Sequence, residues 1–182
     1  MVAQAYWITG PWRGRLGIVP RPRGADWLDD ETRAWREAGI DVVVSLLEPD
    51  EEADLDLTGE SSSSTASGLV FHAFPIADRS IPSSPEAAAA VSEEIVDALR
   101  SGKTVVVHCR QGIGRSAMIV AAALIASGLT AETAVNAIRQ SRGLDVPETQ
   151  AQRQWISDFS AWLSSTRAAQ QQHQADGASR RR

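Results

Sequence analysis

The sequence predicts a single α/β domain with a central, mostly parallel sheet flanked by helices. Short β-branched runs at 42–47 and 104–108 have the composition of buried strands. Longer segments with a helical spacing of apolar residues lie between such runs, and some begin with a capping residue. Alternating strands and helices favour parallel strands joined by helical crossovers. The length of 182 residues suits one domain with one substantial core.

Four strands and one helix are predicted in the first half of the chain. The strands are 5–9, 16–19, 42–47 and 69–76. Asp26 is placed to cap a helix that stops at Gly39. The acidic stretch 48–56 has room for a short helix and is most simply a solvated face. Residues 58–68 contain four consecutive serines and predict a flexible surface loop.

The second half predicts one more strand and four helices. Ser84, Pro85 and Glu86 supply a cap, a first-turn proline and an early acid for a helix that stops at Gly102. The strand is 104–108, and the remaining helices end near Ser127 or span 131–142 and 147–163. Residues 167–182 are rich in Gln, Ala and Arg without apolar periodicity, which predicts a disordered tail after a domain of residues 1–166.

Composition argues against several classes of function. The formal net charge of -5 disfavours a nucleic-acid partner, and no apolar run is long enough to cross a membrane. The N-terminus lacks a basic segment followed by an apolar one, so we expect no secretory signal. The single cysteine, Cys109, rules out an internal disulfide and a multi-cysteine metal cage, and the three histidines lack metal-ligand spacing. We expect a monomer without metal or cofactor in the reducing cytoplasm.

The segment 105–116, Val-Val-Val-His-Cys-Arg-Gln-Gly-Ile-Gly-Arg-Ser, carries most of the functional information. A buried strand delivers Cys109 to the carboxyl edge of the sheet, where open α/β sheets bind ligands. The two glycines let the loop curl so that successive N–H groups converge, and the following helix adds its positive end. Such a nest suits a phosphate dianion and favours the thiolate form of the cysteine. The expected phosphate-binding residues are Arg110, Gln111, Gly112, Ile113, Gly114 and Arg115.

Three side chains around this loop have predicted roles. The guanidinium of Arg115 presents paired donors that match two phosphoryl oxygens and stabilise the charge of the transition state. Ser116 is placed to donate a hydrogen bond to the sulfur of Cys109 and so to help it leave. His108 is expected to face away from the site and to support the loop through hydrogen bonds. A lone cysteine after an apolar strand is more often a core residue, but the surrounding glycines and arginine favour the catalytic interpretation.

The pattern His-Cys-x5-Arg-Ser resembles the signature of the protein tyrosine phosphatase superfamily and is complete here. The short chain and the segment 75–82, Pro-Ile-Ala-Asp-Arg-Ser-Ile-Pro, resemble the compact dual-specificity-like branch that includes kinase-associated phosphatase and bacterial relatives. The resemblance covers roughly residues 40–160. It implies a phosphocysteine intermediate that water then hydrolyses without a metal, and a phosphorylated protein as substrate. Phosphotyrosine is favoured, and dual specificity for phosphoserine and phosphothreonine stays open.

Asp78 is the candidate general acid. It lies in a loop at a strand end and is bracketed by Pro75 and Pro82, unlike Asp41, Asp97 or Asp145. The resemblance implies that it protonates the leaving oxygen and later takes a proton from water. The neighbouring Arg79 either contacts substrate or pairs with an acid.

A second group of polar residues lies near the predicted last helix. Glu148 and Gln152 are four residues apart and would share one helix face. The resemblance implies that a glutamine-containing segment here positions the hydrolytic water, and it favours Gln152 and Glu148 over Gln150 and Gln154. Glu148 is equally consistent with a simple first-turn charge.

Three other functions compete with a protein phosphatase. A pseudophosphatase would bind phosphorylated ligands without cleaving them, but it would normally lack the cysteine, the arginine or the acid. A rhodanese-type sulfur-transfer enzyme would lack the Asp78 segment and the Arg-Ser ending of the loop. A phosphoinositide phosphatase often carries lysines in the loop, whereas this loop has Arg110, Gln111 and Ile113.

Overall fold

The computed structural model describes residues 4–179 of the chain, and side chains as far as residue 173. Its centre is a five-stranded sheet in the order β1-β2-β5-β3-β4. The strands are β1 (Tyr6–Ile8), β2 (Arg15–Ile18), β3 (Val42–Ser45), β4 (Val70–Ala73) and β5 (Thr104–His108). Only the edge strand β1 is antiparallel to its neighbour, and the other three pairings are parallel. The predicted α/β fold with a mostly parallel sheet is therefore confirmed.

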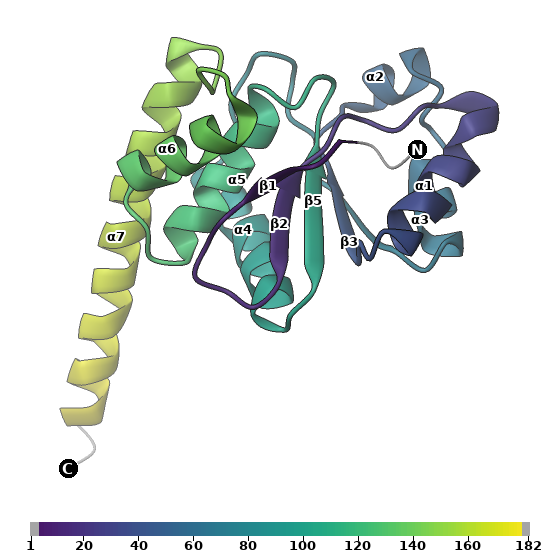
Figure 1. Ribbon diagram of the computed structural model, residues 1–182. Helices are drawn as coiled ribbons and strands as arrows, with labels where there is room; N and C mark the ends of the chain where they lie inside the picture. Colours follow the sequence, from purple (N-terminus) through teal and green to yellow (C-terminus); the bar gives the residue numbers. More distant parts are fainter. Residues whose placement is uncertain (1–3, 180–182) are drawn as a thin grey trace.

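Helices cover both faces of the sheet (Figure 1). They are α1 (Leu28–Glu37), α2 (Pro49–Asp54), α3 (Glu60–Ala66), α4 (Pro85–Arg100), α5 (Arg115–Ala126), α6 (Ala131–Arg142) and α7 (Gln150–Ser179), with a 3-10 turn at Ala25–Trp27. Helices α4 to α7 lie on one side, and α1 and α3 lie on the other. Among the residues described, no helix is both long and apolar enough to cross a bilayer.

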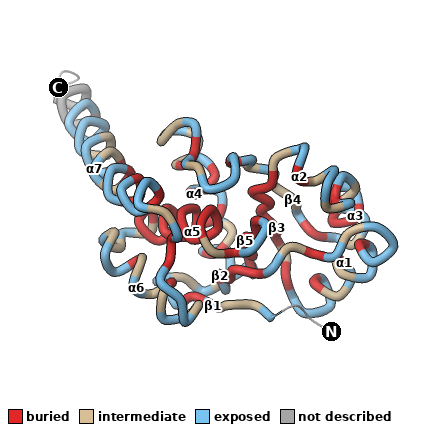
Figure 2. The backbone as a smooth tube through the Cα atoms, turned by 90° about the horizontal axis from the view of Figure 1, so that it is seen from above, coloured by how far each residue is buried: buried red, intermediate tan, exposed pale blue. Residues whose placement is uncertain are grey.

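The core follows from the alternation of side chains along the central strands. Val105 and Val107 of β5 point into the larger apolar cluster beneath α4 and α5, while Val106 points into the smaller cluster with Trp35 of α1. Every residue of α5 is buried, as expected for a helix that is apolar on all sides. Figure 2 shows α5 as a continuous buried element between the sheet and the outer helices.

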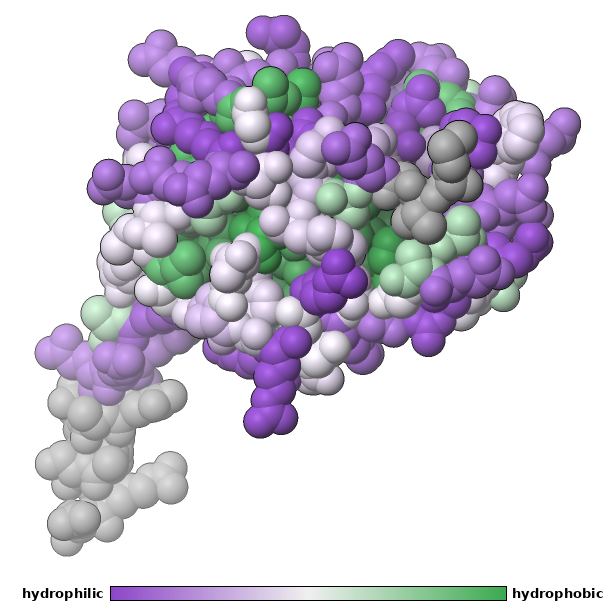
Figure 3. All heavy atoms as spheres, in the orientation of Figure 1, coloured by the Kyte–Doolittle hydropathy of each residue, from purple (hydrophilic) through white to green (hydrophobic). Residues whose placement is uncertain are grey.

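The outer surface is mostly polar. Figure 3 shows hydrophilic side chains over the peripheral helices, with apolar ones gathered towards the centre of the face where β1 lies. Two arginines stack on aromatic rings of β1, of which Trp7 is exposed and Tyr6 half-buried. Arg15 stacks on Trp7 at 3.7 Å, and Arg142 stacks on Tyr6 at 3.8 Å.

The predicted loop at 58–68 is wrong, because residues 60–66 form helix α3. Ser63 and Ser64 are buried, whereas Ser61 and Ser62 are exposed. The Ser63 hydroxyl donates to Asp29 at 2.6 Å and lies 2.9 Å from the Thr32 hydroxyl, so that α3 is tied to α1. Serine content indicated a loop, but these tertiary hydrogen bonds outweigh that weak local preference.

Three further expectations differ from the structure. Asp26 does not cap α1, which has no side-chain cap at its start. The acidic stretch 48–56 is not simply solvated, because it forms α2 and Glu51 is buried. The disordered tail was predicted for residues 167–182, but helix α7 continues to Ser179, and residues 180–182 lie outside the described part of the chain. Arg167 ties this extension to the body by donating to the carbonyl of Ala126 at 2.9 Å.

Candidate active site

Cys109 lies directly after β5, at the carboxyl edge of the parallel strands, and is almost buried with 3% of its surface exposed. The backbone N–H of Gly112 donates to its sulfur at 3.2 Å. Gly112 has a φ of +67°, and a Cβ at this position would lie 2.9 Å from Ile18. The loop therefore curls back over the sulfur in a way that needs glycine at this position.

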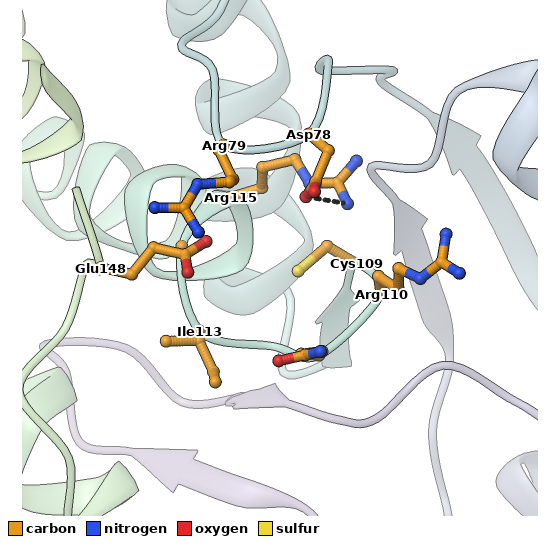
Figure 4. A pocket seen from close by; sticks show the side chains of 9 residues that line it. Asp78, Arg79, Cys109, Arg110, Ile113, Arg115 and Glu148 are labelled. Carbon is orange, nitrogen blue, oxygen red and sulfur yellow. Dashed lines mark hydrogen bonds and ion pairs between the residues drawn. The ribbon is translucent and has the colours of Figure 1, made fainter.

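A pocket of about 140 Å³ opens above this sulfur. Its lining consists of Asp78, Arg79, Cys109, Arg110, Gln111, Ile113, Gly114, Arg115 and Glu148. Figure 4 shows Asp78 and Arg115 on one side of the sulfur and Ile113 and Glu148 on another. The pocket thus contains most of the residues predicted to bind phosphate, together with the predicted general acid.

Arg115, the first residue of α5, is held rigidly beneath the pocket. Its Nη1 donates to Glu51 at 2.5 Å and to the carbonyl of Ile76 at 2.8 Å, and its Nη2 donates to Glu51 at 2.9 Å. Leu46 accepts a longer bond at 3.3 Å. The pair with Glu51 is bidentate, and this fixes the plane of the guanidinium as well as its position.

The charges of Arg115 and Glu51 stabilise each other. Burial alone would lower the pKa of Arg115, but the hydrogen bonds to Glu51 and the nearby Cys109 and Asp78 raise it above its ordinary value. The same hydrogen bonds lower the pKa of Glu51 despite the opposing effect of its burial. The site therefore keeps a permanent cation at the base of the phosphate pocket.

Asp78 lies on the rim of the pocket, and 59% of its side chain is exposed. Its Oδ1 accepts from Nη2 of Arg115 at 3.0 Å. A tight turn in which Ser80 N–H donates to Ala77 at 2.9 Å holds this segment, and Arg79 within the turn has a φ of +58°. Asp78 therefore occupies one donor of Arg115 at the edge of the pocket.

Arg79 and Arg110 extend the positive charge of the rim. Both line the pocket, and Arg79 forms no ion pair within the described part of the chain. Arg110 is half exposed and approaches Glu51 only at 3.9 Å. Figure 4 shows the two guanidinium groups on opposite sides of the pocket, with that of Arg79 directed towards Glu148.

Ser116 does not make its predicted bond. Its hydroxyl is fully buried and has no hydrogen-bond partner among the described residues, while the sulfur of Cys109 accepts from Gly112 instead. Ser116 follows Arg115 within the first turn of α5 and has no exposed surface.

Glu148 and Gln152 both lie against the loop that holds Cys109, but they do not share a helix face as predicted, because α7 begins at Gln150 and Glu148 precedes it. A Cβ on Gly114 would lie 2.7 Å from Gln152 and 2.8 Å from Glu148. Glu148 also lines the pocket, whereas Gln152 is buried and donates to the carbonyl of Ser80 at 3.2 Å. Gln152 therefore connects the general-acid loop to the phosphate loop. Gln150 and Gln154 are exposed.

Sequence reasoning missed Glu51. Its only local signal is a capping box at the start of α2. The side chain of Glu48 accepts from the backbone of Glu51, and the side chain of Glu51 accepts from the backbone of Glu48. This signal predicts a helix but not the packing of that helix over Arg115. No group of three or more His, Cys, Asp or Glu side chains in the described chain could hold a metal ion.

Two relatives among well-studied proteins resemble this chain. Human cyclin-dependent kinase inhibitor 3 is 28% identical over 94 residues, which are 50% of this chain and 44% of that protein. The rat protein of the same name is 28% identical over 104 residues, which are 54% of this chain and 49% of that protein. The matched region thus spans about half the length of these relatives.

Solved structures agree with the fold. Kinase associated phosphatase, with its catalytic-site cysteine substituted by serine, has a TM-score of 0.83 at 20% identity over 90% of this chain and 97% of that chain. Tk-PTP in its active form has a TM-score of 0.71 at 28% identity over 88% of this chain and 99% of that chain.

The family model described as a polymorphic toxin system DSP-PTPase phosphatase matches residues 18–129, which is more than half of the chain. Together with the complete His108-to-Ser116 signature and the pocket built around it, this match identifies a phosphatase. The chain belongs to the DSP-PTPase phosphatase family of polymorphic toxin systems, and so to the compact branch of the protein tyrosine phosphatase superfamily.

Proposed function

We propose that the protein hydrolyses phosphotyrosine on proteins through a phosphocysteine intermediate. The observation that carries the proposal is the convergence of Cys109, Arg115 and Asp78 on one small pocket. A nucleophile, a fixed cation and an acid at its mouth are the three groups that cleavage of a phosphate monoester requires.

In the first step the phosphoryl group binds against the loop amides and Arg115, and displaces Asp78 from Nη2. The thiolate of Cys109 attacks phosphorus, the bond from phosphorus to the phenolic oxygen breaks, and Asp78 gives its proton to that oxygen. The guanidinium and the amides stabilise the charge on the equatorial oxygens during transfer. Release of Asp78 from Arg115 frees its carboxyl group to reach the leaving oxygen.

In the second step water attacks phosphorus, the sulfur–phosphorus bond breaks, and Asp78 takes a proton from that water. Inorganic phosphate leaves and the thiolate of Cys109 is restored. Glu148 and Gln152 contact the loop beside the pocket and are placed to orient this water. This step needs no metal, because the protein supplies both the electrostatic stabilisation and the base.

Two features favour a protein substrate. The loop carries Arg110, Gln111 and Ile113 and has no lysine. Arg79 and Arg110 lie on the rim, where they can contact acidic residues that flank a phosphorylated side chain. The relatives include a protein whose name is kinase associated phosphatase, which agrees with a phosphoprotein substrate.

The decisive test compares the wild type with Cys109→Ser on phosphotyrosine, phosphoserine and phosphothreonine peptides and on phosphoinositides. We expect phosphotyrosine peptides to be hydrolysed fastest, and the variant to lose turnover while it still binds vanadate or phosphate. Turnover close to wild type in the variant would remove Cys109 from the nucleophile role. A higher kcat/KM on phosphoinositides than on any peptide would overturn the substrate assignment.

Inhibition gives an independent test of the chemistry. Vanadate and thiol oxidants should inhibit, because one resembles the transferred phosphoryl group and the others convert the thiolate of Cys109 to an oxidised sulfur. Chelators should leave the rate unchanged. Inhibition by a chelator that a divalent metal reverses would contradict the mechanism.

A further inference from the structure

Behind the nucleophile, on the face of the sheet covered by α1 and α3, His108 and Glu60 form a fully buried pair. His108 has no exposed surface and Glu60 is 1% exposed, and Nε2 of the ring lies 2.8 Å from Oε1 of the carboxylate. His108 is the last residue of β5, so it points to the same side of the sheet as Val106, towards Trp35 of α1. The imidazole ring therefore faces away from the pocket although Cys109 follows it directly.

The contact with His108 is the main compensation for burying Glu60. No lysine or arginine nitrogen in the described part of the chain lies within 4 Å of this carboxylate. The 2.8 Å approach is an ion-pair contact and not a regular hydrogen bond, because among the described residues neither ring nitrogen of His108 and neither carboxylate oxygen of Glu60 has a hydrogen-bond partner. The buried Trp35 Nε1 and Ser64 Oγ are likewise without a partner there. Burial and the nearby Glu60 raise the pKa of Glu52, and His108 opposes this rise. Such a buried carboxylate is costly unless it has a specific partner.

The pair also has a counterpart at the other end of the phosphate loop. Glu51 of α2 binds Arg115 at the end of the loop. Glu60 of α3 contacts His108 at its start. The carbonyl of His108 also accepts from Leu46 N–H at 3.0 Å. The loop that holds Cys109 thus starts from a residue anchored through both its ring and its backbone.

We propose that Glu60 is a positioning residue for the nucleophile and acts through His108. An ionised carboxylate only accepts hydrogen bonds, so its approach to Nε2 at 2.8 Å favours the tautomer with a proton on Nε2. This proton sets the tautomer and the orientation of the ring, and through the ring it sets the direction in which the chain enters the loop at Cys109. The inference rests on the proposed function, because only a nucleophilic Cys109 needs such orientation.

The test uses Glu60→Leu, which removes the acceptor, and Glu60→Gln, whose amide oxygen can still accept. Ser64→Ala is the matched control, because Ser64 is a buried residue of α3 without a partner. At a temperature where each variant is folded, Glu60→Leu should lower kcat on an aryl phosphate by about 10- to 100-fold with KM nearly unchanged. Its Cys109 should also react more slowly with iodoacetate. Glu60→Gln and Ser64→Ala should keep kcat within about threefold of wild type.

Proton NMR of the ¹⁵N-labelled wild type gives a second readout that needs no variant to fold. A protected Nε2–H resonance of His108 is expected, and it should persist in Glu60→Gln. The absence of this proton in the wild type would overturn the proposal. So would full kcat in folded Glu60→Leu, an equal loss in Ser64→Ala, or an equal loss in Glu60→Gln. If the wild type itself failed to cleave phosphate esters, the proposed function would fall, while the NMR result would still report on the Glu60 contact.

Discussion

The loop 108–116 and the segment 48–66 contact each other at the same site, yet only the loop has a recognisable pattern. The loop joins β5 to α5 and supplies the sulfur, the amides and the guanidinium. The other segment forms α2 and α3 and supplies Glu51 and Glu60, which hold the two ends of the loop. Its sequence is acidic and rich in serine, and it predicts only surface structure.

The difference shows where chemistry and support are encoded. Groups that must reach one phosphate from a single turn of chain have a fixed local spacing, which is visible as a motif. Groups that hold this turn from outside need only reach it in space. They can come from any segment that packs nearby, and a carboxylate such as Glu51 looks like any surface acid in the sequence. Substitutions in the loop should therefore lower activity most. Substitutions of Glu51 or Glu60 in the supporting segment should lower it less, but more than substitutions of neighbouring residues in the same segment.

The largest effect is expected for Arg115→Lys. A lysine cannot bind Glu51 and a phosphate with paired donors at the same time, so transition-state stabilisation is lost. We expect kcat/KM on an aryl phosphate to fall by about 10³-fold or more. Arg33→Lys, in an exposed pair with Asp30, is the control and should be close to wild type. A fall of less than tenfold in Arg115→Lys would show that the guanidinium geometry is not needed.

Asp78→Ala should lower turnover by about 10² to 10⁴-fold, with a smaller loss for substrates that have good leaving groups. Because Asp78 competes with phosphate for Nη2 of Arg115, the variant should bind vanadate at least as tightly as the wild type. Steady-state rates across a series of aryl phosphates measure the first effect, with Asp97→Ala on the exposed face of α4 as control. An equal loss for every leaving group would indicate that Asp78 is structural.

Glu51→Gln tests the supporting segment directly. An amide cannot match both Nη atoms of Arg115 with two acceptors, so the guanidinium should lose its fixed plane. We expect kcat/KM to fall by about 10- to 100-fold, which is less than for Arg115→Lys. Asp50→Asn, on the exposed side of the same helix, should change little. If Glu51→Gln had wild-type activity, the segment 48–66 would be only a cover for the core.

The smallest effect concerns stability at acid pH. The pKa of Glu51 is lowered from 4.5 by the hydrogen bonds of Arg115, so its contribution to stability is complete above pH 4.5. It is lost as the pH falls through the lower pKa of the folded state. The free energy of unfolding of the wild type should therefore exceed that of Glu51→Gln by about 2 kcal/mol at neutral pH and approach it in acid. Urea titrations at several pH values measure this, and a difference that grew in acid would contradict the sign.

Much of the fold was predictable because its signals are local. The β-branched runs of β3 and β5 and the Ser84–Pro85 start of α4 correspond to elements in the structure, and the Ser84 hydroxyl accepts from Ala87 as a cap. Helix α3 was not predictable, because it depends on hydrogen bonds between Ser63 and residues of α1 about thirty positions earlier. No local preference of a serine run contains this information.

The sequence by itself determined the proposed chemistry, because the predicted nucleophile, amide nest and clamp lie within eight consecutive positions ending at Ser116, and Asp78 lies in a proline-bracketed loop. The tertiary structure alone decided how these groups are held. It placed Glu51 on Arg115, Glu60 on His108, and Asp78 on a donor of Arg115. The physical reason is that spacing along the chain fixes the relative positions of nearby residues only. The partner of a buried charge is set by tertiary packing and can be distant in the sequence.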